Sequence, residues 1–222
     1  MRIAHATPRP RPSGPAVIAL HSSGASGRQW QTLEARLHPR SQVIALAFPE
    51  RVRSLAVYEP VLFRPLADFH RRGGPSGLVL DLAAAMQRDL RAGLVEHAAS
   101  RFVDYWSGRG TWAAMPSERR RAVGLRMPAV AAQFPALWND PMALADYRAL
   151  DLPVLLLQGA RSPIAPRRIA ELLGATIPRI ELQTMTAMAH LGPITHPNTV
   201  AQRIAAFLAR VDDVDADLGI AA

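Results

Sequence analysis

The stretch VIALAFPERVRSLAVYEP, residues 43–60, decides how this chain can fold. Two apolar runs, 43–48 and 55–58, have the composition of buried strands, and only the joint PERVRS (49–54) separates them. A crossover between parallel strands takes a dozen or more residues, usually including a helix. The second strand is therefore expected either to return antiparallel as a hairpin or to follow a joint that runs extended back along the sheet.

The sequence on both sides of the joint alternates between strand and helix patterns. Short apolar runs predict buried strands, and helical spacing between and after them predicts covering helices. This rhythm predicts an α/β fold with a mostly parallel sheet and flanking helices. The strands are expected at 16–20, 42–48, 54–60, 152–159 and 179–185, and the last helix at 199–211. A helix beginning at Pro166 and ended by Gly174 is also expected.

The predicted organisation is a core interrupted by a helical insert. Residues 64–148 show helical spacing with no convincing strand, and Pro128 and Pro135 are expected to break this segment into short helices. Its size and placement suit a lid. The α/β core is assigned to 16–63 and 149–211, a flexible Pro/Arg-rich arm to 1–15, and a frayed acidic tail to 212–222.

Composition narrows the function classes. The 222 residues include no cysteine, which excludes disulfides, thiolate metal sites and a cysteine nucleophile. The net charge is +8, but every basic residue is a scattered arginine, so no nucleic-acid partner is expected. We expect no cofactor or metal. No apolar run is long enough to span a bilayer and the start lacks a signal-like segment, so a cytoplasmic protein is expected. The sequence does not indicate an oligomeric state.

Two local patterns resemble the α/β-hydrolase family. In AVIALHSSGASGRQW (16–30), a strand runs into a polar loop, and the family uses such a loop for an oxyanion-hole N–H. Ser22 and Ser23 are the backbone donors this resemblance implies, although an ordinary polar loop is the alternative. In RIELQTMTAMAHLGPITHP (179–197), His190 lies where the family places its general base. His196 is interpreted as a surface or helix-capping residue.

The resemblance also implies an acid that orients the histidine. After the strand at 152–159, where the family usually has an aspartate, this chain has Ser162. Some family members place the carboxylate after the strand that precedes the lid, and Glu59 lies there. A carboxylate at either place can hold the imidazole tautomer. Glu59 is the candidate acid, Asp104 and Asp151 are weaker alternatives, and a purely structural strand-end carboxylate is the competing interpretation.

The family's nucleophile is missing. The expected G-x-S-x-G turn has no match, since Ser26 and Ser76 do not follow buried strands. In the family this turn falls within the joint, where two βα units of roughly 30 residues each would be needed. A smaller, less stable sheet without its central strand is therefore expected.

Three functional hypotheses follow. The first is an impaired hydrolase of an ester-like bond in a small apolar substrate. The second is a non-catalytic protein that binds a small ligand, and the third is an incomplete gene product. Four aromatic residues of the insert could line an apolar pocket or simply form core: Tyr105, Trp106, Trp112 and Trp138.

Overall fold

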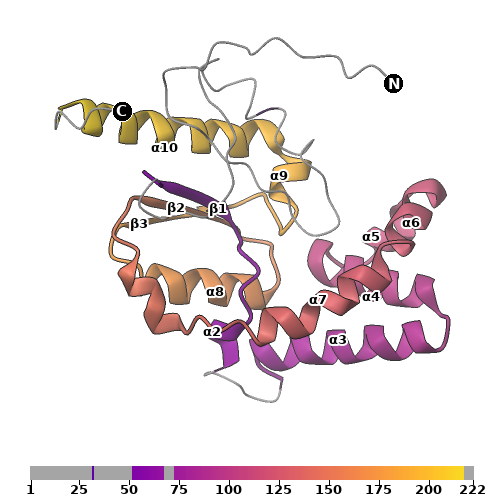
Figure 1. Cartoon of the computed structure of the whole chain (residues 1–222). Helices are drawn as coiled ribbons and strands as arrows, with labels where there is room; N and C mark the ends of the chain where they lie inside the picture. The colour runs from indigo at the N-terminus through magenta and orange to yellow at the C-terminus, as the bar shows by residue number, and fades with distance from the viewer. Residues whose placement is uncertain (1–31, 33–51, 68–72, 218–222) are drawn as a thin grey trace, which may run out of the picture.

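The computed structural model describes residue 32 and residues 52–67 and 73–217. The arm and the strands predicted at 16–20 and 42–48 lie outside these residues. Within them, one parallel sheet has the order β1 (Leu55–Tyr58), β2 (Val154–Gly159) and β3 (Ile180–Met185). Helices flank the sheet (Figure 1), so the predicted α/β fold is confirmed. Three strands make up the sheet in the part of the chain described.

The central strand β2 has a mostly apolar sequence, VLLLQG, which agrees with its burial. All of its residues are buried, because helices cover both faces of the sheet. Leu155 and Leu157 pack with the C-terminal helix α10 (Pro197–Asp217), while Val154 and Leu156 pack with α8 (Ile164–Gly174) on the opposite face. Figure 1 shows α10 and α8 on opposite sides of the strands.

The secondary-structure elements described between β1 and β2 are all helices, joined by short loops. After Phe63 the chain forms a compact helical layer, which lies beside the sheet in Figure 1. Its elements are α2 (Arg64–Ala67), α3 (Pro75–Arg91), α4 (Val95–Ser107), α5 (Thr111–Ala114), α6 (Ser117–Gly124), α7 (Met127–Trp138) and the 3₁₀ helix η3 (Leu144–Ala149). The short helix α9 (Gly192–Thr195) follows β3 and leads into α10.

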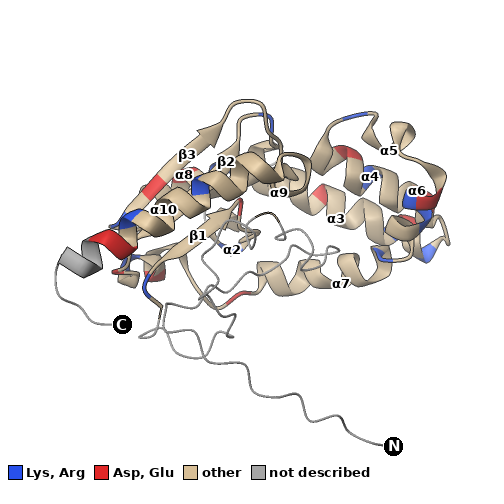
Figure 2. Ribbon diagram, turned by 90° about the horizontal axis from the view of Figure 1, so that it is seen from above, with Lys and Arg blue, Asp and Glu red and all other residues tan. Residues whose placement is uncertain are grey.

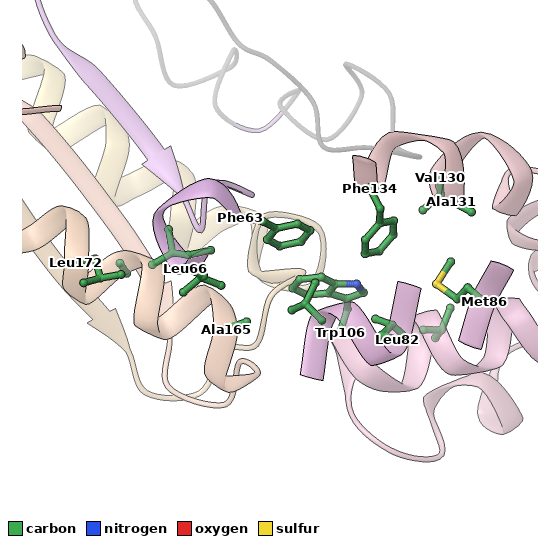
Figure 3. Packing of buried hydrophobic residues seen from close by; sticks show 14 of the residues in the cluster. Phe63, Leu66, Leu82, Met86, Trp106, Val130, Ala131, Phe134, Ala165 and Leu172 are labelled. Carbon is green, nitrogen blue, oxygen red and sulfur yellow. The ribbon is translucent and has the colours of Figure 1, made fainter. Parts of the chain in front are cut away.

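Phe63 joins the helical layer to the sheet in one hydrophobic core. Its side chain is 1% exposed, and its ring stacks with Trp106 at 6.4 Å between centroids. Rings of α7 lie closer, with Phe134 at 5.8 Å and Trp138 at 5.3 Å. Figure 3 shows Phe63 between residues of α2 and α8 on one side and residues of α3, α4 and α7 on the other. The helical layer therefore shares its core with one face of the sheet.

Three local predictions need correction. Pro135 does not break a helix: α7 continues through it, because Val130, Ala131 and Phe134 are buried and hold the helix against the core. Helix α8 begins at Ile164, so Pro166 is its third residue, where the first turn still tolerates proline. The last helix was predicted to end at 211, but α10 extends into the acidic tail as far as Asp217.

Charged residues are mixed over the surface. Figure 2 shows basic and acidic residues interspersed along α10 and around α6. Exposed ion pairs such as Arg210–Glu181 and Arg101–Asp89, both 2.7 Å, join opposite charges. That no nucleic acid binds here stays a prediction. None of the helices described has both the length and the apolar character needed to cross a membrane.

Candidate active site

The parallel sheet brings two predicted site residues to the same edge. Glu59 directly follows β1, and its backbone N–H donates to the Leu157 carbonyl at 2.9 Å, one step beyond the β1–β2 ladder. His190 lies in the histidine loop (186–191), which joins β3 to α9. Both residues follow the carboxyl ends of parallel strands, which is where α/β sheets commonly bind ligands.

Glu59 is a buried carboxylate that makes two hydrogen bonds. It is 2% exposed; its Oε1 accepts from the Gly159 N–H at 2.6 Å, and its Oε2 lies 2.8 Å from His190 Nδ1. Its φ of 42° is the single positive value among the non-glycine residues described. Backbone strain of this kind persists where surrounding contacts hold it, and it is concentrated at functional sites.

The contact with Glu59 defines how His190 can react. An ionised carboxylate only accepts hydrogen bonds, so in neutral His190 the proton lies on Nδ1 and the lone pair on Nε2. The His190 side chain is 13% exposed. On its other side the imidazole packs against Trp106 of α4, with ring centroids 4.4 Å apart. The site thus combines an oriented histidine with an aromatic wall from the helical layer.

The structure shows which of the three candidate acids, Glu59, Asp104 or Asp151, contacts His190. Asp104 lies on α4, where its Oδ1 accepts a hydrogen bond from the Trp112 N–H at 2.8 Å. Asp151 is exposed and precedes β2, so it lies at the opposite end of the strand from Gly159. Among the described residues, Glu59 is therefore the one of these three acids that contacts His190.

Ser162 follows β2 at the place where an aspartate was expected. It is 5% exposed, and its hydroxyl has no hydrogen-bond partner among the described residues. The Glu59 carboxylate reaches from the neighbouring strand to the N–H of Gly159, three residues before Ser162. The acid in contact with the histidine thus comes from β1 instead of from the loop after β2.

The structure places the remaining predicted site residues in different environments or does not describe them. Ser22 and Ser23 lie outside the described residues. His196 is exposed and ends α9, and its ring contacts the Thr195 hydroxyl at 2.9 Å. Of the four aromatics, Trp106 and Trp112 are buried in the core, whereas Tyr105 and Trp138 are partly buried against it.

Sequence reasoning missed two contacts to the histidine loop. One is the packing of Trp106 on His190. The other is the hydrogen bond from the Tyr58 hydroxyl to the Ala189 carbonyl at 2.7 Å. The sequence offered one indication of the Tyr58 contact, which is that Tyr58 directly precedes the candidate acid Glu59. No group of three or more His, Cys, Asp or Glu that could hold a metal occurs in the part of the chain described.

Burial raises the pKa of all three tyrosines of the chain. The pKa of Tyr105 rises to about 12 by burial, and that of Tyr58 rises through burial and the charge of Glu59. The pKa of Tyr147 rises through burial and the charges of Asp140 and Asp146. Each shift favours the neutral phenol in the folded state.

We expect stability to fall when the pH is raised above about 10. The unfolded tyrosines ionise near this pH, whereas the folded ones keep their protons. The stabilisation is therefore complete below pH 10 and is lost as the pH rises through the folded values, near 12 for Tyr105. The chain has no lysine or cysteine to obscure this range. Denaturant unfolding at stepped pH, with tyrosinate absorbance, measures the effect. Ionisation of all three tyrosines near pH 10 in the folded protein would contradict it.

Comparison with known proteins finds similarity both in sequence and in structure. The chain is 30% identical to the pimeloyl-acyl carrier protein methyl ester esterase of Serratia marcescens, over 87% of this chain and 93% of the relative. Its structure resembles that of an alpha/beta hydrolase from Sphaerobacter thermophilus, with a TM-score of 0.51 and 18% identity, over 87% of this chain and 92% of the other. No family model matches the chain.

The alignment with the Serratia protein is longer than the chain itself. It spans 240 positions, whereas 87% of 222 residues is about 193. About 47 of the aligned positions are therefore residues of the relative that stand opposite gaps in this chain.

Proposed function

Because this chain belongs to the α/β-hydrolase family, we propose that it is an esterase-like hydrolase of reduced activity. The proposed reaction is slow hydrolysis of an ester-like bond in a small apolar substrate, in the cytoplasm. The observation that carries the proposal is the 2.8 Å contact between Glu59 Oε2 and His190 Nδ1, which leaves His190 Nε2 as the base. An oriented general base is one of the parts that ester hydrolysis requires.

In the proposed mechanism water replaces the missing serine. His190 Nε2 takes a proton from a water molecule as the water oxygen bonds to the ester carbonyl carbon. The buried Glu59 carboxylate stabilises the imidazolium that forms and keeps its orientation. The tetrahedral intermediate then collapses with loss of the alkoxide, which receives the proton from Nε2. The backbone N–H groups of Ser22 and Ser23 are the proposed oxyanion donors.

Two findings support the ester chemistry and the reduced rate. The name of the Serratia relative specifies hydrolysis of a methyl ester on an acyl chain, which is the same class of bond. The roughly 47 gapped positions exceed one βα unit of about 30 residues and fall short of the roughly 60 residues of two such units, which the joint is proposed to lack. Without a positioned serine no covalent intermediate forms, so the single difficult step is not divided into two easier ones.

The proposal predicts slow turnover of p-nitrophenyl acetate that depends on His190. The variant His190→Ala should lower the rate by at least about a hundredfold, the usual contribution of general-base catalysis. His196→Ala is the matched control, because His196 is exposed six residues further on and should leave the rate unchanged. A serine-reactive fluorophosphonate should not label the protein.

Other outcomes would replace the proposal. Stoichiometric labelling of one serine would show that the nucleophile is present at another position. Equal rates for the parent and His190→Ala would remove the catalytic role of the histidine. Saturable binding of a small apolar ligand without turnover would favour the non-catalytic binding protein, and an aggregating, molten sample the incomplete gene product.

A further inference from the structure

Two consecutive residues at the end of β1 hold two consecutive residues of the histidine loop. The Tyr58 hydroxyl donates to the Ala189 carbonyl at 2.7 Å, and the Glu59 carboxylate contacts the His190 ring at 2.8 Å. Each contact joins residues 131 apart in the sequence. One contact therefore fixes the backbone before His190, and the other fixes the side chain itself.

The Ala189 carbonyl lies in the histidine loop, three residues before the start of α9. It also accepts a hydrogen bond from the Gly192 N–H at 2.9 Å, so two donors hold the same oxygen. One residue earlier, the Met188 carbonyl accepts from the Arg161 N–H at 2.9 Å. A loop held at positions 188 and 189 leaves His190 little freedom to move away from Glu59.

Gly192 is packed directly against the Tyr58 ring. A Cβ atom at residue 192 would collide with Tyr58 Oη and Cζ, so only glycine fits there without displacement of the ring. The Tyr58 ring also packs against the buried cluster of β2 and α10 residues, so it has a fixed place beneath the loop. The fit of ring and glycine sets the distance between the end of β1 and the start of α9.

We propose that Tyr58 is a positioning residue that holds the His190 imidazole against Glu59 through the Ala189 carbonyl and the close packing with Gly192. This inference rests on the proposed role of His190 as a base. Tyr58 touches the backbone of the loop and not the imidazole, so its effect passes through the loop. A tyrosine is needed because phenylalanine would fill the same space without donating the hydrogen bond.

The test is the variant Tyr58→Phe, observed by NMR of the imidazole. In the parent, the Nδ1 proton held by Glu59 should give a protected downfield resonance. In Tyr58→Phe this proton should exchange about fivefold faster, as expected for the loss of one ordinary hydrogen bond. Any ester turnover should fall by a similar factor in kcat with KM unchanged. Tyr147→Phe, which removes a hydroxyl from a tyrosine of η3, is the matched control and should leave the resonance as in the parent.

Gly192→Ala provides a second measurement. The collision with the Tyr58 ring should disturb the His190 resonance strongly, and the double variant Tyr58→Leu/Gly192→Ala should disturb it less than the two single changes predict together. Additive effects, or an unchanged resonance in Tyr58→Phe, would overturn the inference. The resonance is independent of turnover, so an inactive protein with a Tyr58-dependent imidazole would refute the proposed hydrolysis and leave the positioning role standing.

Discussion

The Glu59→Gln variant is expected to remain folded and to lose at least about a hundredfold of its ester turnover. Glutamine has the shape of glutamate, so the buried space stays filled. The Gly159 N–H donates to one side-chain oxygen at 2.6 Å, and this donor requires an acceptor in the variant as well. The carboxamide must therefore place its oxygen toward Gly159 and its NH₂ group toward His190.

That orientation reverses the tautomer of the imidazole. An NH₂ group facing Nδ1 at the 2.8 Å position of Glu59 Oε2 donates a hydrogen bond, so Nδ1 becomes the acceptor and the proton moves to Nε2. A protonated Nε2 has no lone pair with which to take a proton from water. Turnover of p-nitrophenyl acetate measures the loss, and imidazole ¹⁵N shifts report the tautomer. A variant with the parent's rate and the exchanged tautomer would exclude Nε2 as the base.

Comparing Glu59→Ala with Glu59→Gln distinguishes the contribution of Glu59 to stability from its control of the His190 tautomer. Alanine removes both acceptors, leaving the Gly159 N–H buried without its partner. We expect a loss of about 1–3 kcal/mol in the free energy of unfolding, or a Tm lower by roughly 5 °C for a chain of this size. Glu59→Gln should retain most of this stability. Equal destabilisation by both variants would contradict the orientation argument above.

Glu59 and His190 were predicted from the family resemblance, whereas the sequence left open whether the strand at 54–60 follows an extended joint or returns as a hairpin that would reverse Glu59. The structure shows that β1, β2 and β3 run parallel. A residue that follows β1 and a residue that follows β3 must emerge at the same end of the sheet, whatever fills the interval between them. The apolar run of β2 was informative, because a strand buried on both faces is mostly apolar, with Gln158 as the polar residue of this strand. The strand was predicted from a local pattern, and the two site residues from the resemblance.

Other features depend on contacts that no local pattern encodes. The hydrogen bond from the Tyr58 hydroxyl to the Ala189 carbonyl joins segments far apart in the sequence, and so does the packing of Trp106 on His190. Pro135 was expected to end a helix from its own chemistry, but the buried face of α7 outweighed that preference. The helix α10 likewise extends beyond residue 211, its predicted end, into the acidic segment as far as Asp217.

Restoring the missing segment is expected to have the larger effect on catalysis. The change inserts at the joint (49–54) the two βα units of a complete family member, which include the strand, G-x-S-x-G turn and helix of the nucleophile. The serine would then attack the ester with His190 as its base, and we expect turnover to rise by at least about a thousandfold. The inserted strand would also lie beside β1, which is an outer strand of the sheet among the residues described.

The same insertion with alanine in place of the serine is the matched control. It should give the same gain in stability, because it supplies the same strands and helices, but no gain in turnover and no fluorophosphonate label. The serine form should be labelled at that one residue. If both forms fold and hydrolyse p-nitrophenyl acetate at the parent's rate, the retained Glu59–His190 pair cannot serve a nucleophile, and the missing segment does not explain the reduced activity. A thousandfold difference between the two forms would instead support the proposal that the six-residue joint lacks the nucleophile.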